Sequence, residues 1–137
     1  MKKPTEKFRR RAQRPRRTPR IGALVHEFAL ASSVTLPSEL AMAAAQASGQ
    51  STGTGELPMT LFSPKGGQIK TSGGLEIATQ SISEAASLDL LVIAAIWRDP
   101  RRVIKRHPEL IPFIAKLVNQ GSSIAAVGTG SFLLAET

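Results

Sequence analysis

Short runs rich in apolar residues alternate along the chain with segments of helical pattern, and this alternation constrains the fold more than any other feature. The runs are residues 21–26, 57–63, 88–97 and 122–128. Apolar runs of this length are typical of buried strands. Strands that alternate with helices favour a largely parallel sheet with helices on both faces. We therefore expect a single α/β domain over residues 21–137.

Capping residues, glycines and prolines give the expected boundaries of the helices. The helix before the glycine-rich connector is capped by Thr35 or Ser38 and ended by Gly49. Asp99 followed by Pro100 predicts another helix start, because Asp accepts backbone N–H groups and Pro fits the first turn. The remaining signals are a third helix start at His107-Pro108, a helix stop at Gly121 and a hairpin around Ser72-Gly73-Gly74.

The first twenty residues differ in composition from the rest of the chain. They contain ten Lys and Arg residues and one acid, whereas residues 21–137 contain eight basic and nine acidic residues. Residues 1–20 hold too little apolar surface to fold, so we expect a disordered tail. The tail either binds nucleic acid phosphates non-specifically or is only a solvated extension. The nucleic-acid candidates are Arg9, Arg10, Arg11, Arg14, Arg16 and Arg17.

The sequence excludes several kinds of chemistry and location. It contains no cysteine, which rules out disulfides, thiolate metal sites and a cysteine nucleophile. His26 and Glu27 interrupt the first apolar run, so this run does not fit a secretory signal. No apolar run approaches the roughly 20 residues needed to span a bilayer. We therefore expect a soluble, cytoplasmic protein that contacts no membrane and holds no metal or cofactor.

The stretch AAVGTGSFLLAE, residues 125–136, predicts a strand, a tight glycine turn and a helix. Such a joint serves either as a phosphate cradle or as a nucleophile elbow, in which one strained side chain sits between strand and helix. The dinucleotide fingerprint needs a third glycine, where this chain has Leu133, and an acid about 20 residues later. The elbow is therefore the preferred interpretation.

Four stretches that span residues 21–136 in order carry a family resemblance. They are LVHEFALASSVTLPSELAMAAA, LFSPKGGQIKTSGGLEIATQ, LDLLVIAAIWRDPRRVI and HPELIPFIAKLVNQGSSIAAVGTGSFLLAE. Together they resemble the class I glutamine-amidotransferase-like superfamily in its ThiJ/PfpI branch, and in particular the N-terminal domain of AraC-type (GlxA-like) transcriptional regulators. The resemblance implies a flavodoxin-like, three-layer fold. It also implies a truncated domain, incomplete at its C-terminus and without the helix-turn-helix units of such regulators.

The catalytic positions of this family are altered in the chain. In catalytic relatives the elbow is V-C-[ST]-G, which places Gly128 at the cysteine position. The acid that relatives carry ahead of Pro37 falls on Ser33, and their glycine-rich turn is replaced by Ala94-Ala95-Ile96-Trp97. The resemblance therefore implies a domain that senses a ligand and catalyses no reaction.

An enzyme with a hydroxyl nucleophile is the alternative. Thr129 or Ser131 would need a base to take its proton, and His26, at the end of the first strand, is the candidate. We prefer to interpret both hydroxyls as caps of the elbow helix, and His107 as a capping or surface residue. Glu27 either faces the crevice at the strand ends or is a solvated loop acid.

The expected ligand crevice lies at the carboxyl ends of the strands, where parallel α/β sheets bind their ligands. Its candidate walls are Ser33, Trp97, Gly128, Thr129 and Gly130, and its ligand would be an unidentified small molecule. The alternative is that these are only core and turn residues. An incomplete sheet would expose an edge and an apolar surface, so we also expect self-association or a homodimer.

Overall fold

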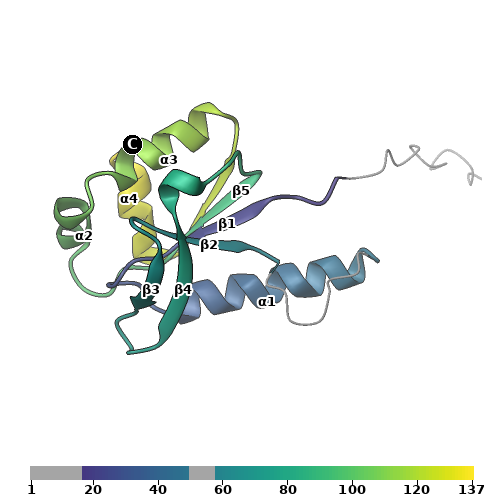
Figure 1. Ribbon diagram of the computed structural model, residues 1–137, viewed down its shortest axis with the longest axis horizontal. Helices are drawn as coiled ribbons and strands as arrows, with labels where there is room; N and C mark the ends of the chain where they lie inside the picture. The colour runs from purple at the N-terminus through teal and green to yellow at the C-terminus, as the bar shows by residue number, and fades with distance from the viewer. Residues whose placement is uncertain (1–16, 50–57) are drawn as a thin grey trace, which may run out of the picture.

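The computed structural model describes residues 17–49 and 58–137 (Figure 1). Within them, six strands form one sheet in the order β3-β4-β2-β1-β5-β6. Every neighbouring pair is parallel except β3 and β4, which form an antiparallel hairpin. The predictions of a largely parallel sheet and of the hairpin are confirmed. The elements are β1 (Ile21–Leu24), α1 (Ser32–Ala47), β2 (Thr60–Ser63), β3 (Gly67–Lys70), β4 (Glu76–Ser81), the 3-10 turn η1 (Ile82–Glu84), β5 (Leu90–Ile93), α2 (Pro100–Arg106), α3 (Leu110–Asn119), β6 (Ser123–Ala126), the 3-10 turn η2 (Gly128–Gly130) and α4 (Ser131–Ala135).

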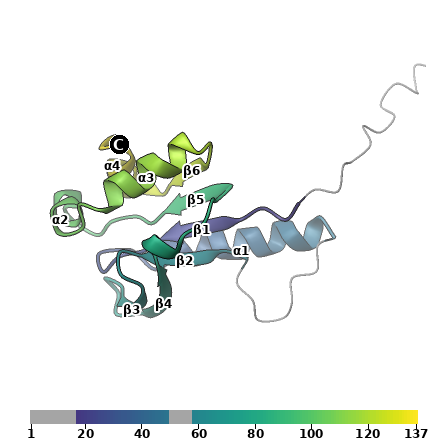
Figure 2. The ribbon, with the colours of Figure 1, turned by 45° about the horizontal axis from the view of Figure 1, so that its top comes forward.

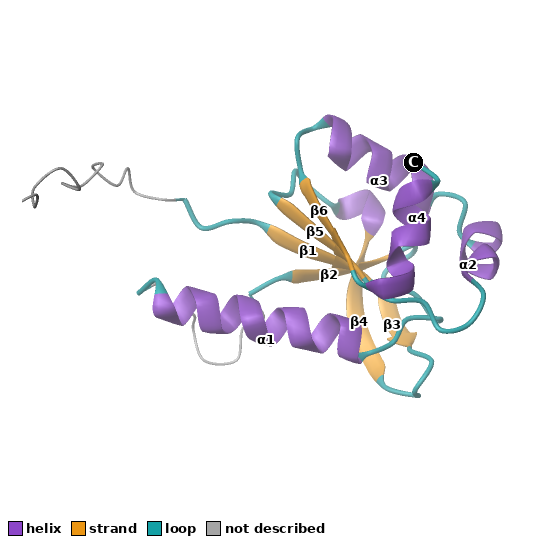
Figure 3. Cartoon of the chain, turned by 180° about the vertical axis from the view of Figure 1, so that it is seen from behind, coloured by secondary structure: helices purple, strands orange, loops and turns teal. Residues whose placement is uncertain are grey.

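Helices cover both faces of the sheet. Because side chains alternate along a strand, Leu91 and Ile93 of β5 lie on one face, where they pack in one core cluster with buried residues of α3 and α4. Ala23 and Val92 lie on the other face, in a second cluster with Val34 of α1. Figures 2 and 3 show α1 on one side of the strands and α3 and α4 on the other. Helices on both faces of a parallel sheet are what the alternating apolar runs predict, and the three-layer, flavodoxin-like arrangement is the one that the family resemblance implies.

The start of α1 differs from the prediction. The helix begins at Ser32, its N-cap is Ala31 without a side-chain hydrogen bond, and it contains Pro37. Thr35 and Ser38 lie inside the helix, so neither caps it. The helix forms ahead of the proline because the N–H of Thr35 already donates to the Ala31 carbonyl at 3.0 Å. A proline inside a helix removes its own N–H from this ladder and crowds the carbonyl four residues before it, and α1 forms despite this cost.

Other helix boundaries follow the predicted local signals. Asp99 is the N-cap of α2 and accepts the N–H of Arg101 at 3.0 Å, and Pro100 occupies the first turn. Gly49 follows α1 with φ at +73°, and Gly121 follows α3 with φ at +87°. Both glycines lie in the left-handed region, where a helix ends and a side chain would be strained.

Strand β5 is shorter than the predicted run. It ends at Ile93, and residues 94–96 are buried but continue no regular ladder, although Ile96 forms an isolated antiparallel bridge with Ala29. Their backbone N–H groups donate instead to the carbonyl of Leu24, the hydroxyl of Ser33 and the hydroxyl of Thr129. Because these partners come from three different elements, the regular ladder stops and the segment lies across the carboxyl edge of the sheet.

The predicted tail falls largely outside the described residues. Residues 1–16 are not among them, so tail disorder and its nucleic-acid role stay predictions. The described end of the tail contacts the sheet: Arg17 pairs with Asp89, and the N–H of Arg20 donates to the same carboxylate at 2.6 Å. That backbone hydrogen bond and the charge of Arg17 outweigh desolvation and hold the pKa of Asp89 below its usual value.

Candidate ligand site at the strand-to-helix elbow

The joint between β6 and α4 has the geometry of an elbow. Val127 is extended, and its N–H donates to the Ile93 carbonyl at 2.9 Å. Gly128 then enters the left-handed region, with φ at +48°, and η2 leads directly into α4. Within 4 Å, a Cβ on Gly128 would meet the Ala95 Cβ alone, at 3.9 Å. A side chain therefore has room at the strained position that an elbow gives to its nucleophile, and the chain places glycine there.

Gly130 lets the elbow pack directly on the end of β5. The residue is buried, and a Cβ there would lie 2.7 Å from the carbonyl oxygen of Ala94 and 2.8 Å from that of Ile93. Backbone oxygens cannot move aside as the end of a flexible side chain can. This predicted wall residue is thus required for close packing between the elbow and β5.

Thr129 bonds to the segment beneath the elbow. Its hydroxyl accepts the N–H of Ile96 at 2.8 Å and donates to the carbonyl of the same residue at 2.7 Å. The N-cap of α4 is Gly130, with no side-chain hydrogen bond, so the prediction that Thr129 and Ser131 cap this helix is wrong. The hydroxyl of Thr129 instead satisfies two buried backbone groups that no neighbouring strand reaches.

Ser33 holds the same segment from the other side. Its side chain is almost fully buried, donates to the Leu30 carbonyl at 2.6 Å and accepts the N–H of Ala95 at 2.8 Å. Ser33 and Thr129 therefore bind consecutive residues, Ala95 and Ile96, although they come from helices at opposite ends of the chain. The structure brings four of the five predicted wall residues to this one segment.

Trp97 is the fifth predicted wall residue, and its side chain is largely exposed. Its backbone N–H donates to the Phe28 carbonyl at 2.7 Å, which ties the segment to the loop after β1. The side chain retains 52% of its accessible surface. An indole this exposed encloses little, so Trp97 contributes to an outer surface more than to a crevice wall.

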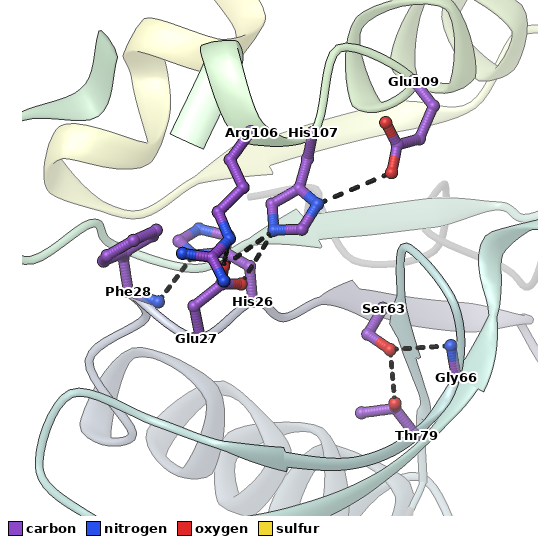
Figure 4. Close-up of polar contacts among 9 residues, drawn as sticks. All are labelled: His26, Glu27, Phe28, Ser63, Gly66, Thr79, Arg106, His107 and Glu109. Atoms are coloured by element: carbon purple, nitrogen blue, oxygen red, sulfur yellow. Dashed lines mark hydrogen bonds and ion pairs between the residues drawn. The ribbon is translucent and has the colours of Figure 1, made fainter. Parts of the chain in front are cut away.

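His26 is buried beside this segment, at the end of β1. It is fully inaccessible; its Nδ1 accepts the N–H of Phe28 at 3.2 Å, and its Nε2 has no hydrogen-bond partner among the described residues (Figure 4). Burial lowers the pKa of His26 to about 4, against the raising effect of the neighbouring Glu27. The ring is therefore neutral at pH 7, and because Nδ1 is an acceptor its proton lies on Nε2.

The structure does not join Thr129 and His26 as nucleophile and base. The hydroxyl proton of Thr129 is directed to the Ile96 carbonyl, which cannot accept a proton as a base. The ring nitrogen of His26 that can accept a proton is occupied by the Phe28 N–H. A base must be within hydrogen-bond reach of the group that it activates, and no hydrogen bond connects these two side chains among the described residues.

Glu27 and His107 form a polar cluster that the sequence did not reveal (Figure 4). His107 Nε2 lies 2.8 Å from a Glu27 oxygen, and Arg106 Nε lies 2.9 Å from the other. The His107 side chain is only 13% exposed, so the interpretation as a surface residue is wrong, and as a capping residue His107 ends α2 and does not open the helix that follows. Burial alone would raise the pKa of Glu27, but its backbone hydrogen bond and the contacts to His107 and Arg106 lower it overall. α3 begins at Leu110, after this cluster.

A pocket of about 230 Å³ lies away from the elbow, between α1, β2 and the hairpin. It is mostly apolar and is lined by Val34, Leu61, Leu75 and Ile77, together with polar residues of α1. None of the five predicted wall residues lines it. Ser63, at the end of β2, is another buried polar residue drawn in Figure 4. Its hydroxyl hydrogen-bonds to the hydroxyl of Thr79 and accepts the N–H of Gly66, which fixes the hairpin to β2.

Two further properties concern the described ranges only. Residues 17–49 and 58–137 contain no group of three or more His, Cys, Asp or Glu side chains placed to hold a metal ion. In the same ranges, no helix combines the length and the apolar character needed to cross a bilayer.

Comparison with known proteins identifies the fold. No protein-family model matches the sequence, and no curated protein matches it either. Among solved structures, a candidate transcriptional regulator from Vibrio parahaemolyticus is 22% identical, with a TM-score of 0.71 over 86% of this chain and 60% of its own. An AraC family transcriptional regulator from Pseudomonas putida is 20% identical, with a TM-score of 0.68 over 87% of this chain and 70% of its own.

The chain is also structurally similar to proteins that are not described as regulators. A ThiJ/PfpI domain protein from Brachyspira murdochii is 12% identical, with a TM-score of 0.61 over 85% of this chain and 62% of its own. The chain thus spans about three fifths of the length of the Vibrio and Brachyspira proteins. The elbow, the parallel sheet and these neighbours agree, and the chain has the flavodoxin-like fold that ThiJ/PfpI domain proteins share with regulators of the AraC family.

Proposed function

We propose that the chain is a non-catalytic, ligand-sensing domain related to those of AraC-type transcriptional regulators, and that it works in the cytoplasm. The observation that carries the proposal is an elbow with intact geometry but with Gly128 at the nucleophile position. The hydroxyls of Ser33 and Thr129, which flank it, are both engaged with backbone groups. Regulators among the structural neighbours support a sensing role.

The proposed ligand is a small molecule that lies over the elbow. Gly128 is exposed and leaves open space above Ala95, whereas a catalytic relative would carry a side chain there. Within the described part of the chain, the N–H groups of Gly128 and Thr129 donate to no other group, and free N–H groups at such a turn favour a negatively charged or carbonyl oxygen. A carboxylate or amide group of the ligand therefore fits this position best.

The test is a thermal-shift screen of the full chain against amino acids, short carboxylic acids and their amides. A binding compound raises Tm by mass action. Gly128→Asn fills the space above Ala95, and Asn tolerates a left-handed backbone better than other side chains. The matched control is Gly73→Asn, because a Cβ at Gly73 meets nothing within 4 Å.

We expect the ligand-induced rise in Tm to disappear in Gly128→Asn and to persist in Gly73→Asn. A rise of equal size in both variants would place the ligand elsewhere and contradict the proposed site. The apolar pocket beside α1 would then be the next position to test.

The enzyme alternative makes a different prediction, which a covalent probe separates. A hydroxyl nucleophile would react with a fluorophosphonate, and the label would be lost in Thr129→Ala but kept in Ser131→Ala. Because the Thr129 hydroxyl donates to a carbonyl, we expect no label on the parent chain. Stoichiometric labelling of Thr129 would overturn the non-catalytic assignment.

A further inference from the structure

The positive charge of the described residues is concentrated around α2. Five of their ten Lys and Arg residues fall in the nine residues 98–106. We call this group the α2 basic patch. The other described residues carry five basic and seven acidic side chains, so they are slightly negative overall. The members of the α2 basic patch are Arg98, Arg101, Arg102, Lys105 and Arg106, and all five are exposed.

Little of this charge is neutralised within residues 17–49 and 58–137. Asp99, the one acid inside the patch, is used as the N-cap of α2, where it accepts the N–H of Arg101. Glu27 pairs with Arg106 at 2.9 Å. No described acid lies within ion-pair distance of the other four members. Unpaired cations this close together repel one another and lower the stability of the free protein.

An exposed aromatic residue and a strained backbone adjoin the patch. The Trp97 side chain is 52% exposed and directly precedes Arg98. Arg98 has φ at +70° and is, among the described residues, the one non-glycine with a positive φ. Such a conformation is strained for a residue with a side chain and tends to mark functional positions.

Two of the guanidinium groups lie over the aromatic ring of Phe28. Arg102 lies 5.1 Å and Arg106 6.0 Å from the centre of its ring. Phe28 itself packs against the main core cluster. The two cations are therefore held on a rigid aromatic support, which reduces the side-chain entropy that they would lose on binding an anion.

We propose that the α2 basic patch, with Trp97, binds single-stranded nucleic acid. Phosphates contact the exposed cations, and a base stacks on the Trp97 indole, as cationic grooves with aromatic platforms bind single strands. A membrane surface fits less well, because the apolar residues of α2 face inward: Val103 is buried and Ile104 packs on the core. The helix has no apolar face left to insert into lipid.

The experiment titrates the full chain into a labelled oligodeoxythymidylate and follows two signals. Anisotropy reports binding, and the emission of Trp97, the only tryptophan in the chain, reports contact at the patch. The test variant is R98Q/R101Q/K105Q. The matched control is K65Q/K70Q/K116Q, which removes three exposed cations elsewhere.

We expect the test variant to bind about tenfold more weakly, with a salt slope smaller by about 2, as the loss of three single-strand phosphate contacts requires. The control should lose much less affinity, and binding should quench Trp97. To separate the patch from the tail, the same comparison is made in a full-length chain whose Arg9, Arg10, Arg11, Arg14, Arg16 and Arg17 are all replaced by Gln.

Each other outcome overturns the proposal. Equal losses in the test and control variants would mean that only net charge matters. Loss of all binding when the six tail arginines are replaced would assign binding to the tail. Unchanged Trp97 emission, no oligonucleotide binding at all, or binding to phosphatidylserine vesicles in its place would show that the patch does not bind single strands. Failure of this proposal leaves the ligand site at the elbow untouched, because that site is tested with small molecules.

Discussion

Thr129 shows how a residue with a plausible catalytic hydroxyl can be structural. Its hydroxyl bonds both backbone groups of Ile96, which have no strand partner. Ser33 does the same for the N–H of Ala95. A buried N–H or carbonyl without a partner is costly, so the chain uses two hydroxyls to hold the segment on which the elbow rests.

Removing the Thr129 hydroxyl should therefore destabilise the fold. We expect Thr129→Val to lower the free energy of unfolding by about 1–3 kcal/mol, because it leaves the Ile96 groups unsatisfied. Ser131→Ala is the control, since Ser131 is exposed. Urea denaturation measures both. A loss in Ser131→Ala as large as that in Thr129→Val would restore the capping interpretation.

His26 predicts a dependence of stability on pH. Its pKa is about 4 in the folded chain and about 6.5 when unfolded. Above pH 6.5 both states are neutral; as pH falls toward 4 the unfolded state takes up a proton first, so stability decreases. Below about pH 4 the folded state is protonated too and this loss levels off. Glu27 and Asp89, whose pKa values are lowered, keep their stabilising effect above their unfolded values of 4.5 and 3.8 and lose it as the pH falls below these values.

Between pH 7 and 4.5 we expect the free energy of unfolding to fall by about 1–2 kcal/mol, which is less than the whole shift in the pKa of His26 would give. Urea midpoints across this range measure it in the parent and in His26→Gln, which keeps an acceptor without a titrating ring. The pH dependence should be clearly flatter in the variant. Parallel curves for the two proteins would show that the histidine is accessible or already charged.

At the scale of elements, the elbow and the end of β5 form one unit. The backbone of η2 touches the backbone of β5 because Gly130 has no side chain. The hydroxyls of Ser33 and Thr129 then fix Ala95 and Ile96 between α1 and η2. This unit keeps the elbow shape even though Gly128 provides no nucleophile.

Gly130→Ala tests this contact. A Cβ at 2.7–2.8 Å from two carbonyl oxygens forces the elbow and β5 apart, so we expect a loss of about 1–3 kcal/mol. Gly73→Ala, in an open turn, should change stability by less than about 0.5 kcal/mol. Tm from calorimetry ranks the two variants, and equal Tm values would mean that the elbow does not rest on β5.

At the scale of the whole molecule, α1 leaves large apolar side chains exposed. Leu36 and Leu40, one helical turn apart, are 58% and 62% exposed. Exposed apolar side chains that lie close together favour association.

The predicted self-association should therefore depend on α1. We expect L36E/L40E to raise the dimer dissociation constant by about tenfold or more, as for the loss of central apolar contacts. V118E/F132E, which alters exposed apolar residues of α3 and α4, is the matched control. Sedimentation velocity at several concentrations measures both. A monomeric parent chain, or equal effects of the two variants, would contradict a role for α1.

The sequence by itself determined the local features of this protein. The apolar runs predicted the strands, Gly49 and Gly121 the helix ends, and Asp99-Pro100 the start of α2. The stretch 125–136 likewise predicted the strand, the glycine turn and the helix that form the elbow between β6 and α4. These features depend on the backbone torsion angles that each residue favours and on helix capping, and both are set by residues that are close together in the chain.

Only the tertiary structure decided the partners of the polar side chains. Glu27 meets His107 across 80 residues of chain, and Ser33 meets Ala95 across 62. The start of α1 and the end of β5 also depend on such contacts, and the sequence predicted both incorrectly. The physical reason is that a hydroxyl or carboxylate bonds to whichever backbone or charged group the packed sheet leaves unsatisfied beside it, and that group is fixed only when distant elements come together.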